Sequence, residues 1–271
     1  MQHIKRWLTA LILGPLILWI LVKGSLITIA VLVSAVAVFS VREYLRIIFG
    51  NAEEPVSNTI KIISYIASVL LVVGACLGSW EILVLILALN LMALAIFVLS
   101  RFALDQTIFN SISKQVLGIV YIPLPLCLLI FVRQLEGGTF WIIWFLIVIF
   151  ANDTGAFYTG TFFGKRLLAP NISPKKTIEG SIGGVSASII AGFIFCQIFF
   201  NDLSLSFLTI PGSILLAAAG QIGDLFESAM KRASGIKDSG RILPGHGGML
   251  DRIDGLLPAI PVLYAYLVFV L

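Results

Sequence analysis

The sequence contains little charge for its length. Only 12% of its 271 residues are Asp, Glu, Lys or Arg, whereas hydrophobic residues make up 59% and the mean hydropathy is +1.06. A soluble domain of this size carries roughly 25% charged residues. The composition therefore excludes a soluble globular protein. Its long apolar runs are typical of spanning helices, so we predict an all-α polytopic membrane protein.

Cysteine and histidine are also scarce, with three and two residues respectively. Cys76, Cys127 and Cys196 all lie within apolar segments, their number is odd, and their spacing does not match a metal site. This pattern supports neither a disulfide framework nor a zinc site. We interpret the cysteines as small core residues. The sequence shows no internal repeat, low-complexity tract or soluble domain.

Nine apolar runs approach the length of about 20 residues that a spanning helix needs. The predicted spans are 7–22, 25–41, 62–79, 82–99, 115–132, 140–160, 182–200, 207–225 and 255–271. The first follows Lys5 and Arg6 and resembles a signal peptide, but no small-x-small cleavage pattern precedes the next apolar run. We therefore expect it to be retained as a span.

Basic residues lie almost entirely on one side of these nine spans. With a cytoplasmic N-terminus, only Lys23 and Arg133 fall outside, which leaves 16 of the 18 Lys and Arg residues on the cytoplasmic side. Cytoplasmic loops carry such an excess, so we predict a multi-pass protein of the cytoplasmic (inner or plasma) membrane. The net charge of +4 then reflects topology, and we predict no nucleic-acid partner.

Four aspartates stand inside or beside predicted spans. Asp153 lies within the sixth span, Asp224 near the end of the eighth, and Asp251 and Asp254 just before the ninth. An acid at membrane depth is costly and is a functional candidate. Two carboxylates from neighbouring helix ends can share Mg²⁺, which completes its shell with water and phosphate oxygens. Gly247-Gly248 would let the backbone approach a ligand closely.

Each of these acids also has an ordinary interpretation. Asp224 can end a helix at the membrane interface, beside an ion pair between Glu227 and Lys231. Asp153 can be a buried acid satisfied by Asn or Thr neighbours. Asp251 and Asp254 can be charges that the helix dipole favours at an N-terminus. These alternatives stay open at the level of sequence.

Cations gather in two polar segments on the predicted cytoplasmic side. Residues 173–181 read Ser-Pro-Lys-Lys-Thr-Ile-Glu-Gly-Ser, and Ser173 or Thr177 could cap the next helix, whose N-terminus would attract a phosphate. Residues 228–254 add five further cations, Lys231, Arg232, Lys237, Arg241 and Arg252. As a group they could neutralise a triphosphate; singly, each could be a topogenic loop charge.

The segment 228–254 resembles the signature of the phosphatidate cytidylyltransferases. That pattern has a Ser, a Lys-Arg pair, Lys-Asp, His-Gly-Gly and a terminal Asp-Arg-x-Asp. Here it is filled by Ser228, Lys231, Arg232, Lys237, Asp238, Gly240, Leu243, Pro244, His246, Gly247, Gly248, Met249, Asp251, Arg252, Ile253 and Asp254. The resemblance extends back through Asp153 and residues 173–180. Over 1–110 only the hydrophobic character compares.

The resemblance implies transfer of the cytidylyl group of CTP to phosphatidic acid, with Mg²⁺ and a possible second cation, in a multi-span protein that forms homodimers. We expect one membrane domain over 1–271, with scaffold helices in 1–110, a catalytic half in 111–271 and an active site at the cytoplasmic membrane boundary. The predicted metal ligands are Asp224 and Asp251. The other predicted catalytic residues are Lys237, His246 and Arg252. The predicted substrate-binding residues are Asp153, Ser173, Lys175, Lys176, Ser228, Lys231, Arg232, Asp238, Gly247, Gly248 and Asp254.

Two other functions fit parts of this pattern. A CTP-dependent lipid kinase needs the same metal and triphosphate groups, but it would release CDP. An anion transporter would also hold acids within the membrane, although its charge would lie near the midplane and not at one face. The signature favours cytidylyl transfer.

Overall fold

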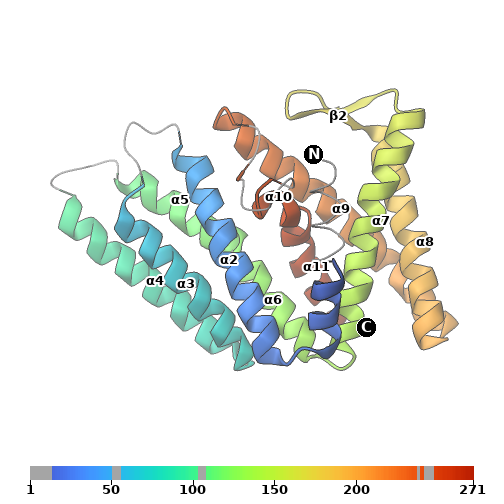
Figure 1. Ribbon diagram of the computed structural model, residues 1–271, viewed down its shortest axis with the longest axis horizontal. Coiled ribbons are helices and arrows are strands. Elements are labelled where there is room, and N and C mark those ends of the chain that lie inside the picture. Colours follow the sequence, from blue (N-terminus) through green and yellow to red (C-terminus); the bar gives the residue numbers. More distant parts are fainter. Residues whose placement is uncertain (1–13, 51–55, 103–107, 237–238, 241–246) are drawn as a thin grey trace. The chain divides into compact units, whose positions relative to one another are not determined.

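The computed structural model describes residues 14–50, 56–102, 108–236, 239–240 and 247–271. Figure 1 shows mostly helices and one short hairpin of two strands. In chain order the elements are α2 (Leu26–Phe49), α3 (Asn58–Cys76), α4 (Trp80–Arg101), α5 (Ile108–Tyr121), α6 (Pro123–Gln134), α7 (Gly138–Phe163), β1 (Leu167–Ala169), β2 (Ser173–Thr177), α8 (Ile178–Phe200), α9 (Leu203–Ala233), α10 (Leu250–Ile253) and α11 (Leu256–Phe269).

In the described part of the chain, eight helical segments are long and apolar enough to cross a membrane. They correspond to the eight predicted spans from 25–41 onward, with α5 and α6 forming one segment and α10 and α11 another. Only residues 14–22 of the predicted first span are described, and they belong to a shorter apolar helix, Gly14–Lys23. The predicted all-α polytopic membrane fold is confirmed.

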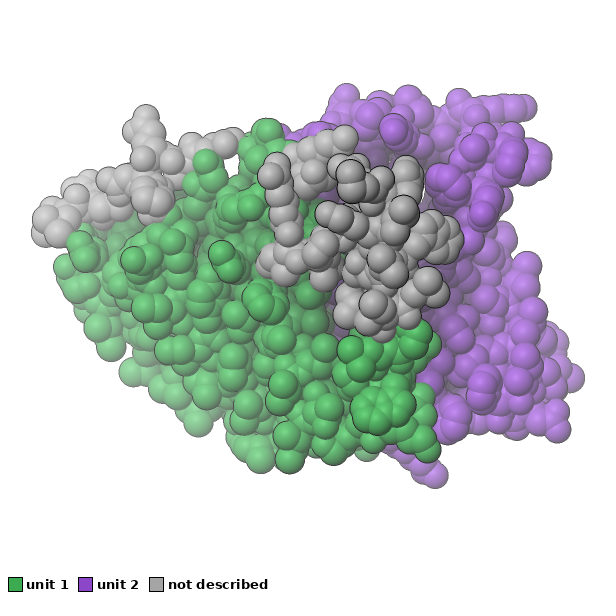
Figure 2. Space-filling view, viewed as in Figure 1, with its two compact units in different colours: residues 1–134, 233–252 green, residues 135–232, 253–271 purple. Residues whose placement is uncertain are grey.

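The chain divides into two compact units, coloured in Figure 2. Unit 1 contains residues 1–134 and 233–252, and unit 2 contains residues 135–232 and 253–271. Each unit therefore joins two separate stretches of chain. The segment that carries the signature, residues 228–254, is divided between them, with Ser228 and Asp254 in unit 2 and Asp251 in unit 1.

Unit 1 consists mainly of α2 to α6, in which α3 packs on α2, α4 and α6. Serine side chains cap the N-termini of three helices: Ser25 for α2, Ser57 for α3 and Ser79 for α4. Such caps satisfy backbone N–H groups that a first helical turn leaves without partners. The predicted span 115–132 is interrupted at Ile122, because Pro123 has no N–H to continue the ladder and starts α6 instead.

Unit 2 contains the close helix pair α7 and α8, which Figure 1 shows side by side beneath the hairpin. A Cβ atom at Gly184 would stand 2.6 Å from the Asn152 side-chain oxygen, and one at Gly155 would overlap Ala187. Within a bilayer the hydrophobic effect does not drive helices together, so their packing depends on small residues that let the backbones approach closely. Gly183-Gly184 thus marks close helix packing, which brings Asn152 and Asp153 close to the start of α8.

Helix α9 is longer than its predicted span and continues from residue 225 to Ala233. At 1.5 Å per residue its 31 residues extend about 46 Å, well beyond the roughly 30 Å hydrocarbon core of a bilayer. It contacts the start of α11 closely, because a Cβ at Gly223 would meet Pro258 at 2.8 Å. The polar end of α9 carries Asp224, Ser228 and the basic residues that follow.

Candidate active site

A cavity of about 430 Å³ lies within unit 2, between α7, β2, the start of α8 and α9. Five of its polar lining residues are Asp153 from α7, Lys175 and Lys176 from β2, and Gln221 and Asp224 from α9. Ala156, Phe157 and Leu168 give it an apolar side. The structure thus brings four predicted site residues, Asp153, Lys175, Lys176 and Asp224, to one hollow that combines charge with an apolar wall.

Asp224 forms an ion pair with Lys176, with 2.6 Å between Oδ2 and Nζ. One helical turn further on, the Ser228 hydroxyl donates to Asp224 Oδ1 at 3.5 Å. The Asp224 side chain is 42% exposed and that of Lys176 is 26% exposed, so both remain accessible to a ligand. Ser228 thus lies next to Asp224, and Lys176 joins them from a different element.

The hairpin holds the two lysines at the cavity. Strands β1 and β2 are antiparallel, with Leu167 opposite Thr177 and Ala169 opposite Ser173. Thr177 caps α8 by accepting a hydrogen bond from Gly180 N at 3.1 Å. Of the two capping residues that the sequence suggested, Thr177 is therefore the one used. Ser173 lies in β2 and is not among the residues that line the cavity.

Glu179 closes the base of the hairpin. Its carboxylate accepts hydrogen bonds from Lys165 N at 3.0 Å and from Arg166 N at 3.1 Å. Acidic side chains are also favoured in the first turn of a helix by the helix dipole. This arrangement fixes the exit from α7 against the entry to α8, so that Lys175 and Lys176 extend along the cavity wall.

Amide side chains, which sequence analysis did not single out, link the helices around the cavity. Gln221 Nε2 donates to Asn152 Oδ1 at 2.8 Å and to the Ser181 carbonyl at 3.1 Å. Ser181 and Gln221 also share a short side-chain hydrogen bond. Gln221 lies three residues before Asp224 and hence on the same helix face. That spacing was the available signal for its role.

Charged side chains in the last turns of α9 interact with one another and with the β1–β2 hairpin. Lys231 pairs with Glu227, whose side chain is fully buried, in the ordinary i, i+4 arrangement. Arg232 Nε donates to the Ile172 carbonyl in the β1–β2 turn at 3.3 Å. The ion pair between Glu227 and Lys231, an alternative open at the sequence level, is therefore present. A substrate role for Lys231 or Arg232 stays a prediction.

Asp254 belongs to unit 2 and lies just before α11. Its carboxylate accepts a hydrogen bond from Gly255 N at 2.8 Å. It also lies within electrostatic range of Asp224 and Asp153. Three of the four predicted acids are thus neighbours in one unit, and Lys176 is the cation paired with one of them.

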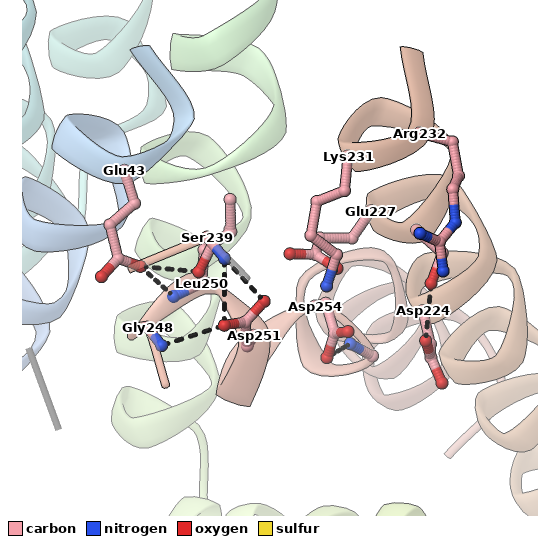
Figure 3. Close-up of polar contacts among 12 residues, drawn as sticks. Glu43, Asp224, Glu227, Lys231, Arg232, Ser239, Gly248, Leu250, Asp251 and Asp254 are labelled. Atoms are coloured by element: carbon pink, nitrogen blue, oxygen red, sulfur yellow. Dashed lines mark hydrogen bonds and ion pairs between the residues drawn. The ribbon is translucent and has the colours of Figure 1, made fainter. Parts of the chain in front are cut away.

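Asp251, in unit 1, is held by backbone donors (Figure 3). Gly248 N donates to its Oδ2 at 2.9 Å, and Ser239 N lies 3.3 Å and 3.2 Å from its two oxygens. Gly247 adopts a φ of 87°, which glycine tolerates without strain. The Gly247-Gly248 turn therefore brings the Gly248 N–H to Asp251 itself. Arg252 follows it in α10 and is exposed.

The acids suit a hard cation by their chemistry. Asp224 and Asp251 offer carboxylate oxygens, which Mg²⁺ prefers. Within the described residues, no three Asp, Glu, His or Cys side chains form a metal-binding group. Few protein ligands are usual for Mg²⁺, which relies on water and phosphate oxygens. Lys237, Asp238, Arg241 and His246, also predicted here, lie outside the described residues.

Comparison with known proteins gives a consistent answer over the whole chain. Residues 4–270 match the Cytidylyltransferase family. The phosphatidate cytidylyltransferase of Staphylococcus haemolyticus (strain JCSC1435) is 34% identical over 97% of this chain and 98% of its own length. The protein of the same name from Staphylococcus aureus (strain COL) is 32% identical over the same shares. The resemblance read from residues 228–254 is confirmed, and the chain belongs to the Cytidylyltransferase family.

Proposed function

We propose that this protein transfers the cytidylyl group of CTP to phosphatidic acid, giving CDP-diacylglycerol and pyrophosphate. The observation that carries the proposal is the unit 2 cavity, where Lys175, Lys176 and Asp224 meet an apolar wall in a chain similar throughout to phosphatidate cytidylyltransferases. Cationic and acidic groups suit a metal–triphosphate, and the apolar side suits a lipid.

The chemistry asks little of a general base, because the acceptor is already an anionic phosphate. An oxygen of phosphatidate forms a bond to the α-phosphorus of CTP, while the bond from that phosphorus to the bridging oxygen breaks and pyrophosphate leaves. The demand is to bring two anions together in line. The positive charges of Lys175 and Lys176 offset the repulsion between the two anionic substrates. Asp224 and Gln221 orient the substrate that binds beside these lysines.

Asp224 and Asp251 are the residues that would hold Mg²⁺. When bound, the metal neutralises charge on the phosphate oxygens and on the leaving pyrophosphate. Asp224 is 22 residues into α9, about 32 Å along the helix axis from its start, which suits a site at the membrane boundary. Acyl chains would then stay in the bilayer while CTP enters from the cytoplasm.

We also propose the cytoplasmic N-terminus, the inner or plasma membrane location and the homodimer on the grounds given by the sequence.

A product assay tests the reaction directly. Purified protein in detergent receives phosphatidic acid, Mg²⁺ and CTP labelled at the α-phosphate. Cytidylyl transfer moves the label into the lipid phase and releases one pyrophosphate per lipid product. A lipid kinase would instead leave the label in water as CDP. Absence of CTP consumption with every divalent metal would overturn the proposal and reopen the transporter interpretation.

A further inference from the structure

Helix α2 contains a buried acid that the signature does not include. Glu43 is 3% exposed, although it lies in the N-terminal region that sequence analysis assigned to scaffold. Burying a carboxylate is costly unless hydrogen bonds compensate for the lost water. An acid retained in this setting needs partners, and those of Glu43 identify what it does.

Its partners come from the signature segment of the same unit. Glu43 Oε2 accepts hydrogen bonds from Leu250 N at 2.8 Å and from the Ser239 hydroxyl at 3.1 Å (Figure 3). Ser239 lies six residues after the end of α9, and Leu250 is the first residue of α10. One carboxylate oxygen of Glu43 thus connects both residues to α2.

Two glycines are shaped around this carboxylate. The three atoms nearest to a Cβ built at Gly240 all belong to Glu43, and its Cδ would be only 2.6 Å away. A Cβ at Gly248 would meet Glu43 Oε2 at 2.5 Å and would overlap the Ser239 hydroxyl. Side chains at both positions are therefore excluded by Glu43 and by the serine bound to it.

The same backbone holds the predicted metal ligand. Ser239 N and Gly248 N, which donate to Asp251, belong to the two residues that pack against Glu43. Ser239 uses its hydroxyl for Glu43 and its N–H for Asp251. A continuous network therefore runs from α2 through Ser239 to the Asp251 carboxylate.

We propose that Glu43 is a positioning residue that anchors the signature segment to α2 and thereby sets the orientation of the Asp251 carboxylate. The consequence for turnover rests on the proposed cytidylyl transfer, whereas the anchoring itself does not. Ser239 connects Glu43 to Asp251, so Glu43 acts through Asp251 in this proposal and not on the reacting atoms.

The first test compares Glu43→Ala and Glu43→Gln with Tyr44→Phe in the full-length protein. Tyr44 is the adjacent residue on α2, and its hydroxyl donates to the Lys114 carbonyl at 2.9 Å, so Tyr44→Phe removes a buried hydrogen bond that does not involve the signature segment. Hydrogen exchange should accelerate at residues 239, 240 and 247–252 in Glu43→Ala and less in Glu43→Gln. In Tyr44→Phe it should match the wild type there.

Steady-state kinetics give the second readout. Loss of an outer partner of a metal ligand typically lowers activity by about 10- to 100-fold. We expect kcat to fall by about 100-fold in Glu43→Ala and by about tenfold in Glu43→Gln, with KM for CTP nearly unchanged because Lys175 and Lys176 are untouched. Wild-type hydrogen exchange at residues 239, 240 and 247–252 in both Glu43 variants would overturn the anchor, whatever their activity.

A double-mutant cycle removes the dependence on any single variant. Gly240→Ala should accelerate exchange and lower kcat, because its methyl group displaces the Glu43 carboxylate. In the Glu43→Ala background the same change should have little further effect, since the clashing atoms are gone. Independent, multiplicative effects would contradict the proposal. If the wild type lacks cytidylyl transfer, the proposed function fails, while the exchange cycle still decides the anchor.

Discussion

At the residue scale, the two predicted metal ligands are held by different partners. Asp224 has a cationic side chain beside it, at 2.6 Å, and remains 42% exposed. Asp251 is held by the backbone N–H groups of Ser239 and Gly248. Neutralising either acid removes a charge that would bind metal, and the change at Asp224 also breaks its ion pair with Lys176.

Asp224→Asn and Asp251→Asn should each abolish turnover while the protein still inserts and purifies. A partly exposed ion pair contributes about 0–1 kcal/mol to stability, so Asp224→Asn should unfold near the wild-type temperature. The matched control is Glu136→Gln, which removes one exposed negative charge from the turn between α6 and α7. Labelled-CTP turnover and thermal unfolding are the measurements. Wild-type activity in either Asp variant would refute the metal assignment.

The buried pair of Glu227 and Lys231 should matter for stability first. Removing one partner of a buried ion pair typically costs about 3–5 kcal/mol, because a charge stays behind in an apolar setting. Lys231→Met should therefore lower the unfolding temperature in detergent sharply, and Glu227→Gln with Lys231→Met should recover part of the loss. A stable Lys231→Met variant with impaired CTP binding would instead support the substrate role predicted from sequence.

At the scale of elements, the β1–β2 hairpin places two lysine side chains at the cavity. It projects Lys175 and Lys176 toward a cavity also lined by α7, α8 and α9. The Thr177 cap and the Glu179 carboxylate join it to the start of α8. The hairpin therefore connects the end of α7 to the start of α8 and forms one side of the cavity.

Lys176→Ala should raise the apparent KM for CTP or lipid more than Lys175→Ala, because only Lys176 also pairs with Asp224. A hydrogen bond to a charged group is worth roughly 1.5–3 kcal/mol, so we expect about tenfold or more for Lys176. Lys165→Ala is the control, since it removes a charge from the same connection outside the cavity lining. If the double variant Lys175→Ala, Lys176→Ala showed unchanged kinetics, the role of these lysines would be purely topogenic.

Hydropathy predicted the helices well and their ends less well. The predicted span 62–79 starts in fact at Asn58, because Ser57 caps a first turn that is polar. Helix α9 continues beyond residue 225, because Asp224, Glu227 and Lys231 find partners that a count of apolar residues does not reveal. The β1–β2 hairpin was predicted only as a basic turn. Its pairing depends on residues brought together by α7 and α8.

The candidate site was predictable where charge stood out against an apolar background. Asp153, Asp224, Asp251 and the lysines before α8 were found in this way. Glu43 and Gln221 were not, because their roles depend on partners far away in the sequence. The Glu43 carboxylate binds residues 196 and 207 positions later. A single sequence does not show such pairing.

At the scale of the whole molecule, the distribution of Lys and Arg predicts one orientation. Helix α7 allows a paired test, because Glu136 precedes it and Lys165 follows it, and both are exposed. In a chain with its three cysteines replaced, Glu136→Cys should react with a membrane-impermeant thiol reagent on intact cells. Lys165→Cys should react only after permeabilisation. The reverse pattern would refute the cytoplasmic N-terminus.

The long separation between Glu43 and its partners has a consequence for biogenesis. At about 5–20 residues per second, the ribosome needs about 10–40 s to add the 207 residues between Glu43 and Leu250. During that time Glu43 lacks the hydrogen bonds that Ser239 and Leu250 provide. A chain that terminates before Ser239 never forms either of them. The Glu43 carboxylate thus gains both hydrogen bonds only after synthesis has passed Leu250.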